Sequence, residues 1–216
     1  MAGFWDDRYK IEGKIWGDAP SPTVLSAIDL FKKEHVRNIL VPGSGYGRNA
    51  AAFHRAGFEV TGIEESETAV DLASQSDPGI HYCCGSVLDM PFDGSIFDGV
   101  YCFNVLHLLR SIDREKFIRL CGEQLRENGI LYYVVFSEKD ESYGRGREVE
   151  PSTFESKPGR EVHYFTSEDL KRTFHDFEIL KTGLVEEPED HGEEGKHVHM
   201  LRWIAARKRP HSGYKR

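Results

Sequence analysis

The sequence contains little cysteine, and its cysteines do not form a motif. The four residues, Cys83, Cys84, Cys102 and Cys121, include no CxxC pair. Zinc ribbons and thioredoxin-like redox sites depend on such pairs, so neither kind of site is indicated. We expect reduced thiols that pack as small core residues, as free cysteines usually do in an intracellular protein.

Long apolar runs are also missing from the sequence. No run approaches the roughly 20 residues that span a bilayer, and residues 1–10 lack the basic-then-apolar order of a secretory signal. We therefore expect a cytoplasmic protein with no membrane partner.

Positive charge is in deficit. The chain has 28 Lys and Arg against 36 Asp and Glu, which gives a formal net charge of -8. Binding to a phosphate backbone depends largely on Lys and Arg, so small substrates are favoured over nucleic acid. With 216 residues, 39% of them hydrophobic, the chain can bury one sizeable core, and we expect a single domain over 1–216.

Apolar strand-like runs alternate with helical patterns along most of the chain. The expected helices are 21–35, 47–56, 67–73, 113–125 and 167–174. The expected strands are 38–42, 59–64, 80–84, 97–103, 129–136, 177–185 and 197–208. Continuous apolar strands separated by helices indicate a parallel sheet covered on both faces. The last two strands flank an acidic turn and predict an antiparallel hairpin. The expected fold is a Rossmann-like α/β three-layer sandwich with a seven-stranded, mostly parallel sheet that ends in this hairpin.

Three glycines, Gly43, Gly45 and Gly47, alternate directly after the first expected strand. Such a turn lets backbone amides and carbonyls approach a ligand closely at the carboxyl end of the strand. A Walker loop needs Lys before Ser or Thr, and this turn has none. The dinucleotide fingerprint places its third glycine where this chain has Arg48, so NAD stays only as an alternative ligand.

An acidic residue ends the second expected strand. Glu64 follows Gly43 by 21 residues, the position at which a carboxylate accepts hydrogen bonds from both hydroxyls of a ribose. A ribose with no pyrophosphate site suggests S-adenosylmethionine (SAM).

Residues 39–66, 86–109 and 127–136 resemble the successive motifs of class I SAM-dependent methyltransferases. More narrowly, "FWDDRY" at 4–9 and "VPG" at 41–43 resemble the tellurite-resistance and thiopurine type of small-molecule methyltransferase. The resemblance implies transfer of a methyl group from SAM to a small-molecule acceptor by in-line displacement.

The resemblance also implies roles for individual residues. The glycine turn would hold the amino acid end of SAM, Glu64 the ribose, and the loop after the third strand the adenine. The implied cofactor residues are Gly43, Ser44, Gly45, Gly47, Glu64, Glu65, Ser86, Val87, Leu88, Phe103, Asn104 and Leu106. Val41 stands two residues before the first glycine, where the family usually has an acid, so the partner of the SAM ammonium is open.

The resemblance divides the single domain into four parts. They are an N-terminal lid and helix (1–36), a SAM-binding core (37–137), a polar, glycine-rich loop on the substrate side (138–165), and a C-terminal helix and hairpin (166–208). The N-terminal segment has no strong period but many aromatic residues. We expect it to close over the site and to present Arg8, Tyr9 and Trp16 to the acceptor; an arm packed permanently on the core is the alternative.

Two groups of histidines have the residue type and the positions for chemistry. His107 is the best-placed general base, should the acceptor need one, and a packing role beside the fourth strand is its alternative. His197 and His199 point to the same side of one strand, with no third metal ligand evident beyond His163 or His191. We expect a solvent-facing pair and no metal.

Two other functional classes stay open at this point. One is an NAD-dependent oxidoreductase, and the other is a non-catalytic, SAM-binding regulatory protein. The sequence identifies neither the acceptor nor the oligomeric state.

Overall fold

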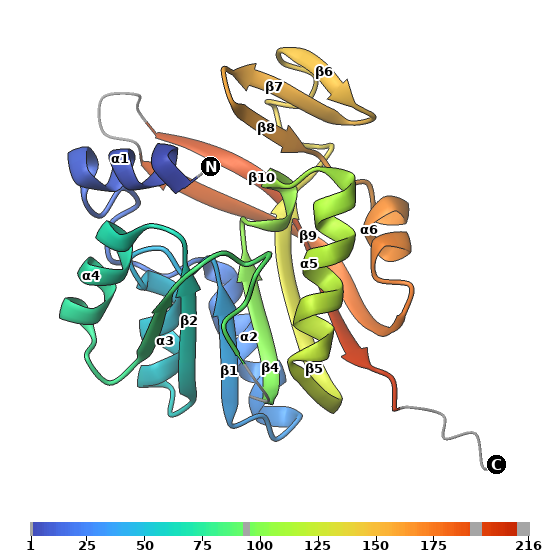
Figure 1. The fold of residues 1–216 in the computed structure, drawn as a ribbon. Coiled ribbons are helices and arrows are strands. Elements are labelled where there is room, and N and C mark those ends of the chain that lie inside the picture. The colour runs from blue at the N-terminus through green and yellow to red at the C-terminus, as the bar shows by residue number, and fades with distance from the viewer. Residues whose placement is uncertain (1, 93–95, 191–195, 211–216) are drawn as a thin grey trace.

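Seven strands form one mixed sheet in the computed structural model, which describes residues 2–92, 96–190 and 196–210 (Figure 1). The strand order is β3-β2-β1-β4-β5-β10-β9. The strands are β1 Asn38–Pro42, β2 Glu59–Glu64, β3 His81–Cys84, β4 Phe97–Phe103, β5 Leu125–Phe136, β9 Phe177–Asp190 and β10 Lys196–Lys208. The first five pair in parallel, whereas β10 is antiparallel to both β5 and β9. The expected fold class is confirmed.

Helices cover both faces of this sheet (Figure 1). They are α2 Pro22–Lys33, α3 Arg48–Arg55, α4 Glu67–Ser76, α5 Ser111–Glu123 and α6 Ser167–Thr173. On one face Phe31 of α2 packs against Phe53 of α3, with ring centroids 5.8 Å apart. On the other face Phe117 of α5 and Phe174, at the end of α6, pack against Tyr133 of β5. Burial of apolar area on both sides is the main source of stability.

The N-terminal segment forms a helix, α1 Ala2–Glu12, which the sequence analysis did not predict. Two ion pairs at i,i+4 spacing support it, Lys10 with Asp6 and Arg8 with Glu12. The helix lies beyond the carboxyl ends of the parallel strands, next to α4 (Figure 1). Its position matches the expected lid, and its opening in the absence of ligand stays a prediction.

Residues 138–165 contain a second, three-stranded sheet, so the expectation of a loop here is wrong. Its strands are β6 Arg147–Glu150, β7 Thr153–Lys157 and β8 Arg160–His163. Cross-strand charges help to hold it, as in the 2.8 Å ion pair between Arg147 and Glu155. Strand β8 contacts the 3-10 turn η1 Leu106–Leu108, which follows β4. The small sheet therefore covers the same end of the large sheet as α1 does (Figure 1).

Three local expectations need correction. Much of the acidic turn expected at 186–196 is strand, because β9 continues to Asp190 and β10 begins at Lys196; His191 lies outside the described residues. Cys102 and Cys121 are buried in the core, but Cys83 is only partly buried and Cys84 is exposed. In the part of the chain that the structure describes, no helix has the length and apolar character to cross a bilayer.

Asp6 anchors α1 to the start of α4, and its removal should release α1. Its carboxylate accepts hydrogen bonds from the Ser66 hydroxyl (2.7 Å) and from the Thr68 backbone N–H (3.1 Å). Asp6→Ala should speed amide hydrogen exchange over 2–12 while exchange in the sheet stays unchanged. Asp7→Ala is the matched control, because Asp7 is exposed. Equal exchange of α1 in both variants would contradict this anchoring.

Candidate functional site

A cavity lies at the carboxyl ends of β1, β2 and β4, between the large sheet and α1. This is the edge at which open α/β sheets bind their ligands. The residues that line it are Trp5, Tyr9, Trp16, Gly43, Ser44, Gly45, Tyr46, Arg48, Asn49, Glu64, Glu65, Val87, Phe103, Asn104, Val105, Leu108, Leu109 and Glu189.

The glycine turn after β1 has a backbone that other residues adopt rarely. Gly43, Gly45 and Gly47 have φ angles of 63°, 55° and 86°. A Cβ on Gly43 would collide with the Val105 side chain, and one on Gly45 would lie 2.9 Å from the Tyr9 hydroxyl. These two glycines thus allow the side chains of Val105 and Tyr9 to come close to the turn. From the sequence, only a ligand was expected to come this close.

Glu64 joins the glycine turn to the start of α4. Its carboxylate, in a side chain only 8% exposed, accepts hydrogen bonds from the backbone N–H groups of Gly45 (2.9 Å) and Ser66 (3.0 Å). Burial raises the pKa of Glu64 above its ordinary value, although these hydrogen bonds oppose the shift. The group is therefore an acceptor whose protonation begins at a higher pH than that of an exposed glutamate.

Aromatic rings of the N-terminal segment cover the cavity. Tyr9 is 5% exposed, and its ring packs edge-on against Tyr46 of the glycine turn. Trp16 stacks on Tyr46 with an interplanar angle of 12°, and its backbone N–H donates to the Tyr46 hydroxyl (3.0 Å). Burial raises the pKa of the Tyr9 phenol, and the nearby charge of Glu64 raises it further. Tyr9 is consequently neutral and can donate a hydrogen bond but cannot act as a base near pH 7.

Three polar side-chain atoms of the lining residues are buried and have no hydrogen-bond partner among the described residues. They are Ser44 Oγ, Asn104 Oδ1 and Trp16 Nε1. Asn104 also has a positive φ of 57°, in the turn that follows β4. Buried polar atoms rarely stay unpaired, so these atoms indicate a polar ligand. A ligand with an ammonium, a carboxylate and hydroxyls, as SAM has, fits these donors and acceptors together with the narrow glycine turn.

Most of the residues expected at the site line the cavity. Those that do are Gly43, Ser44, Gly45, Glu64, Glu65, Val87, Phe103, Asn104, Tyr9 and Trp16. Those that do not are Gly47, Ser86, Leu88, Leu106, Arg8 and His107. Ser86 accepts a hydrogen bond from the Leu88 backbone N–H, and Arg8 is paired with Glu12. Gly47 instead makes room for Tyr82 and Ala73, where α3 begins.

His107 lies behind the cavity, on the side of the small sheet. Its ring is 3% exposed and packs against Phe136 with centroids 4.6 Å apart. Burial lowers the pKa of His107 well below its ordinary value, and the charge of Arg160 lowers it further. The structure therefore favours the packing alternative for His107 over the general base.

Some cavity residues lie far apart in the chain and are not among those predicted from the sequence, for example Trp5, Arg48 and Glu189. Glu189 reaches the cavity because β9 extends beyond the sheet. A buried network holds this strand: Glu187 accepts a hydrogen bond from the Ser21 hydroxyl (2.7 Å) and pairs with Arg48 at 3.5 Å. The acidic residues of 186–190 are the sequence signal for this border, and they lie in strand β9 and not in the expected turn.

A methyl group at position 45 should displace α1. Gly45→Ala would force a Cβ against the Tyr9 hydroxyl and would also strain the backbone by roughly 1–2 kcal/mol. Gly57→Ala is the matched control, because Gly57 has a φ of 93° and no neighbour within 4 Å of its Cβ position. Both variants should melt at lower temperature, but only Gly45→Ala should speed hydrogen exchange in α1. Unchanged exchange there would show that Tyr9 does not depend on this glycine.

Comparison with known proteins gives a family for the central part of the chain. The family model described as a methyltransferase domain matches residues 40–133. A ubiquinone biosynthesis O-methyltransferase of Coxiella burnetii is 26% identical over 117 residues, 52% of this chain and 48% of that protein. The 24-methylenesterol C-methyltransferase 3 of Arabidopsis thaliana is 36% identical over 100 residues, 42% of this chain and 27% of that protein. The chain thus spans about half the length of the first relative and 27% of the length of the second.

Solved structures share the fold over nearly the whole chain. A structure from work on the conversion of a disulfide bond into a thioacetal group during echinomycin biosynthesis matches with a TM-score of 0.78 and 16% identity, covering 99% of this chain and 93% of the other. A 1,6-didemethyltoxoflavin-N1-methyltransferase of Burkholderia thailandensis, with bound S-adenosylhomocysteine, matches with a TM-score of 0.70 and 21% identity. The match covers 97% of this chain and 87% of the other. TehB of Haemophilus influenzae matches with a TM-score of 0.69 and 16% identity, covering 95% of this chain and 67% of the other. Residues 40–133 thus match a methyltransferase domain, and the chain as a whole shares the fold of these solved methyltransferase structures.

Proposed function

We propose that this protein transfers the methyl group of SAM to a small-molecule acceptor. The observation that carries the proposal is the cavity at the carboxyl edge, where the glycine turn and a buried carboxylate meet unpaired polar atoms. The methyltransferase domain matched at 40–133 supports the same conclusion.

The chain offers a partner for each polar part of SAM. Glu64, which ends β2, would accept hydrogen bonds from the ribose hydroxyls. The turn at Gly43–Gly45 would hold the amino acid end, and Val87 would contact the adenine. Val41 is only 2% exposed and lies in the core, so it makes no polar contact with the ammonium. Asn104 Oδ1, a buried acceptor at the cavity, is our candidate for that contact.

The sulfonium of SAM supplies an activated methyl group, so this chain mainly has to orient the acceptor and exclude water. Trp5, Tyr9 and Trp16 cover the cavity and perform the second task. An acceptor enters in line with the methyl group on the side that these rings and Glu189 border. None of these steps requires His107, which we therefore leave out of the mechanism.

A small acceptor suits the enclosure. The lining combines large aromatic side chains with Asn49, Arg48 and Glu189, which gives an apolar body with a few polar groups, as is usual for small-molecule sites. The structural neighbour with bound 1,6-didemethyltoxoflavin and S-adenosylhomocysteine supports a small molecule as well.

Glu64→Gln should weaken binding of S-adenosylhomocysteine by at least about tenfold, because a charged hydrogen-bond acceptor is worth roughly 1.5–3 kcal/mol. Isothermal titration calorimetry measures the change directly. Glu67→Gln, at an exposed position in the first turn of α4, is the matched control and should bind like the wild type. Failure of the folded wild-type chain to bind would overturn the proposed function, whereas equal affinity in Glu64→Gln would remove only Glu64 from the site.

The same site predicts a pH dependence of binding. Only the carboxylate form of Glu64 accepts from both ribose hydroxyls, and its pKa is raised by burial. Lowering the pH from neutrality should therefore weaken binding as Glu64 takes up a proton, and the fall should begin at a higher pH than for an ordinary glutamate. Calorimetry across this range should show the fall in the wild type and a flatter profile in Glu64→Gln. A flat wild-type profile would contradict the role of the carboxylate.

A further inference from the structure

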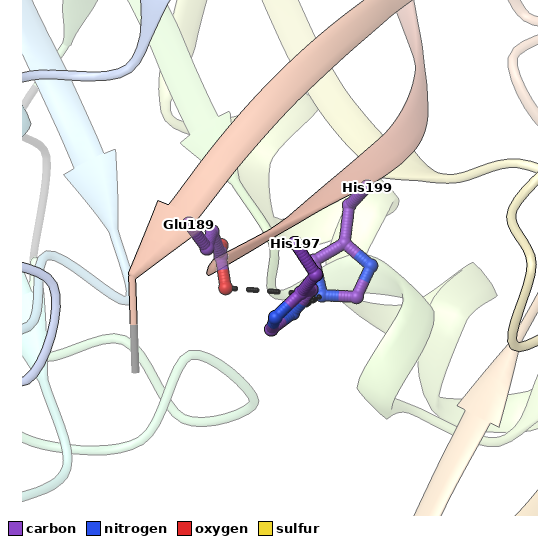
Figure 2. A group of neighbouring side chains, drawn as sticks. All are labelled: Glu189, His197 and His199. Atoms are coloured by element: carbon purple, nitrogen blue, oxygen red, sulfur yellow. Dashed lines mark hydrogen bonds and ion pairs between the residues drawn. The ribbon is translucent and has the colours of Figure 1, made fainter. Parts of the chain in front are cut away.

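Two histidines and a glutamate meet at the end of the β9–β10 hairpin (Figure 2). His197 pairs directly with Glu189 across the two antiparallel strands, and His199 lies two residues further along β10. Cross-strand partners share a face, as do residues i and i+2, so all three side chains project from the same side. One ligand atom from each lies within 4.8 Å of the others.

The two imidazole rings present nitrogen atoms to the same point. His197 Nε2 and His199 Nε2 are 2.9 Å apart, with the ring planes at 87° (Figure 2). Glu189 Oε2 lies 3.8 Å from His199 Nε2. Ligand atoms about 2.0–2.1 Å from a tetrahedral ion are separated by about 3.3 Å, so these spacings need little adjustment to hold one. His199 has a side chain only 14% exposed, and the expectation of a solvent-facing pair is wrong for this residue.

Asp140 fixes the orientation of His199. Its buried carboxylate lies 3.0 Å from His199 Nδ1 and also accepts from the Met200 backbone N–H (2.8 Å). An ionised carboxylate only accepts hydrogen bonds, so His199 donates to Asp140 through Nδ1 and its Nε2 faces the cluster. A carboxylate that holds the second nitrogen of a histidine is the usual support of a metal ligand.

We propose that Glu189, His197 and His199 bind a divalent metal ion of the zinc type. Two imidazoles and one carboxylate suit zinc and its transition-metal neighbours, whereas calcium and magnesium prefer oxygen ligands throughout. Three protein ligands leave a tetrahedral ion one further position, the pattern of zinc sites that act on substrates.

The site adjoins the cavity described above, because Glu189 lines that cavity. The fourth position is therefore filled by water or by a heteroatom of the acceptor. Contact between the ion and the acceptor rests on the proposed methyl transfer, whereas the binding of the metal ion itself does not. The ion would place the acceptor at the border of the cavity that Glu189 lines.

The test uses the full chain without a polyhistidine tag, stripped with a chelator and then dialysed. Zn²⁺ should bind with one equivalent in calorimetry, and Co²⁺ should give visible absorption bands that Zn²⁺ abolishes. His197→Ala and His199→Ala should lose at least tenfold in affinity and lose the Co²⁺ bands. Asp140→Asn should weaken binding by about 10–100-fold through the orientation of His199. His175→Ala is the matched control, because His175 is exposed beyond α6 and should leave binding unchanged.

Melting curves separate loss of the site from loss of the fold. Zn²⁺ should raise the melting temperature of the wild type and of His175→Ala, and not that of His197→Ala. No binding of Zn²⁺ to the wild type at micromolar concentration would overturn the proposal, and so would binding that survives both histidine substitutions. Calorimetry with S-adenosylhomocysteine on the same samples keeps this outcome distinct from a failure of the proposed function.

Discussion

The carboxylate of Glu64 connects three segments that must meet for the cavity to exist. It binds the backbone of Gly45 in the glycine turn and of Ser66 before α4, and the Ser66 hydroxyl in turn donates to Asp6 of α1. Burying a charge is costly unless it is hydrogen-bonded, and its removal would leave two buried N–H groups unsatisfied. The bond network thus makes the covering helix dependent on a group that we expect to bind the cofactor.

A second network, of hydrogen bonds and an ion pair, holds the part of the cavity border that Glu189 lines. Glu187 is 1% exposed and holds β9 against Ser21, which caps α2, and Arg48, which begins α3. The network continues from the Ser21 hydroxyl to the Thr23 hydroxyl, and from there to the Tyr101 hydroxyl in the core of the sheet. Glu189, two residues further along β9, is positioned by this network and not by the hairpin alone.

The sequence predicted what apolar burial determines and missed what polar contacts determine. The sheet followed from continuous apolar runs, and the cavity residues Gly43, Gly45 and Glu64 from their places at the ends of the first two strands. The sequence did not predict strands β6–β8, because charged pairs and a few aromatic side chains hold them and their apolar residues do not alternate. Helix α1 was not predicted because its apolar residues do not recur along one face. The oppositely charged residues at i,i+4 spacing, which form ion pairs, were a usable signal for it. Leu106 and His107 were misplaced because the turn η1 rotates them into the core and brings Leu108 to the cavity.

The covering rings and the hairpin both lie outside the matched domain at 40–133. Trp5, Tyr9 and Trp16 precede the domain, and Glu189 follows it. Selection can therefore alter the chain ends without touching the residues that are expected to hold SAM. One ancestral cofactor domain could in this way acquire new substrates by exchanging its flanking segments. Part of the cavity lining can thus change while the shared domain stays the same, so similarity within 40–133 alone does not identify the acceptor.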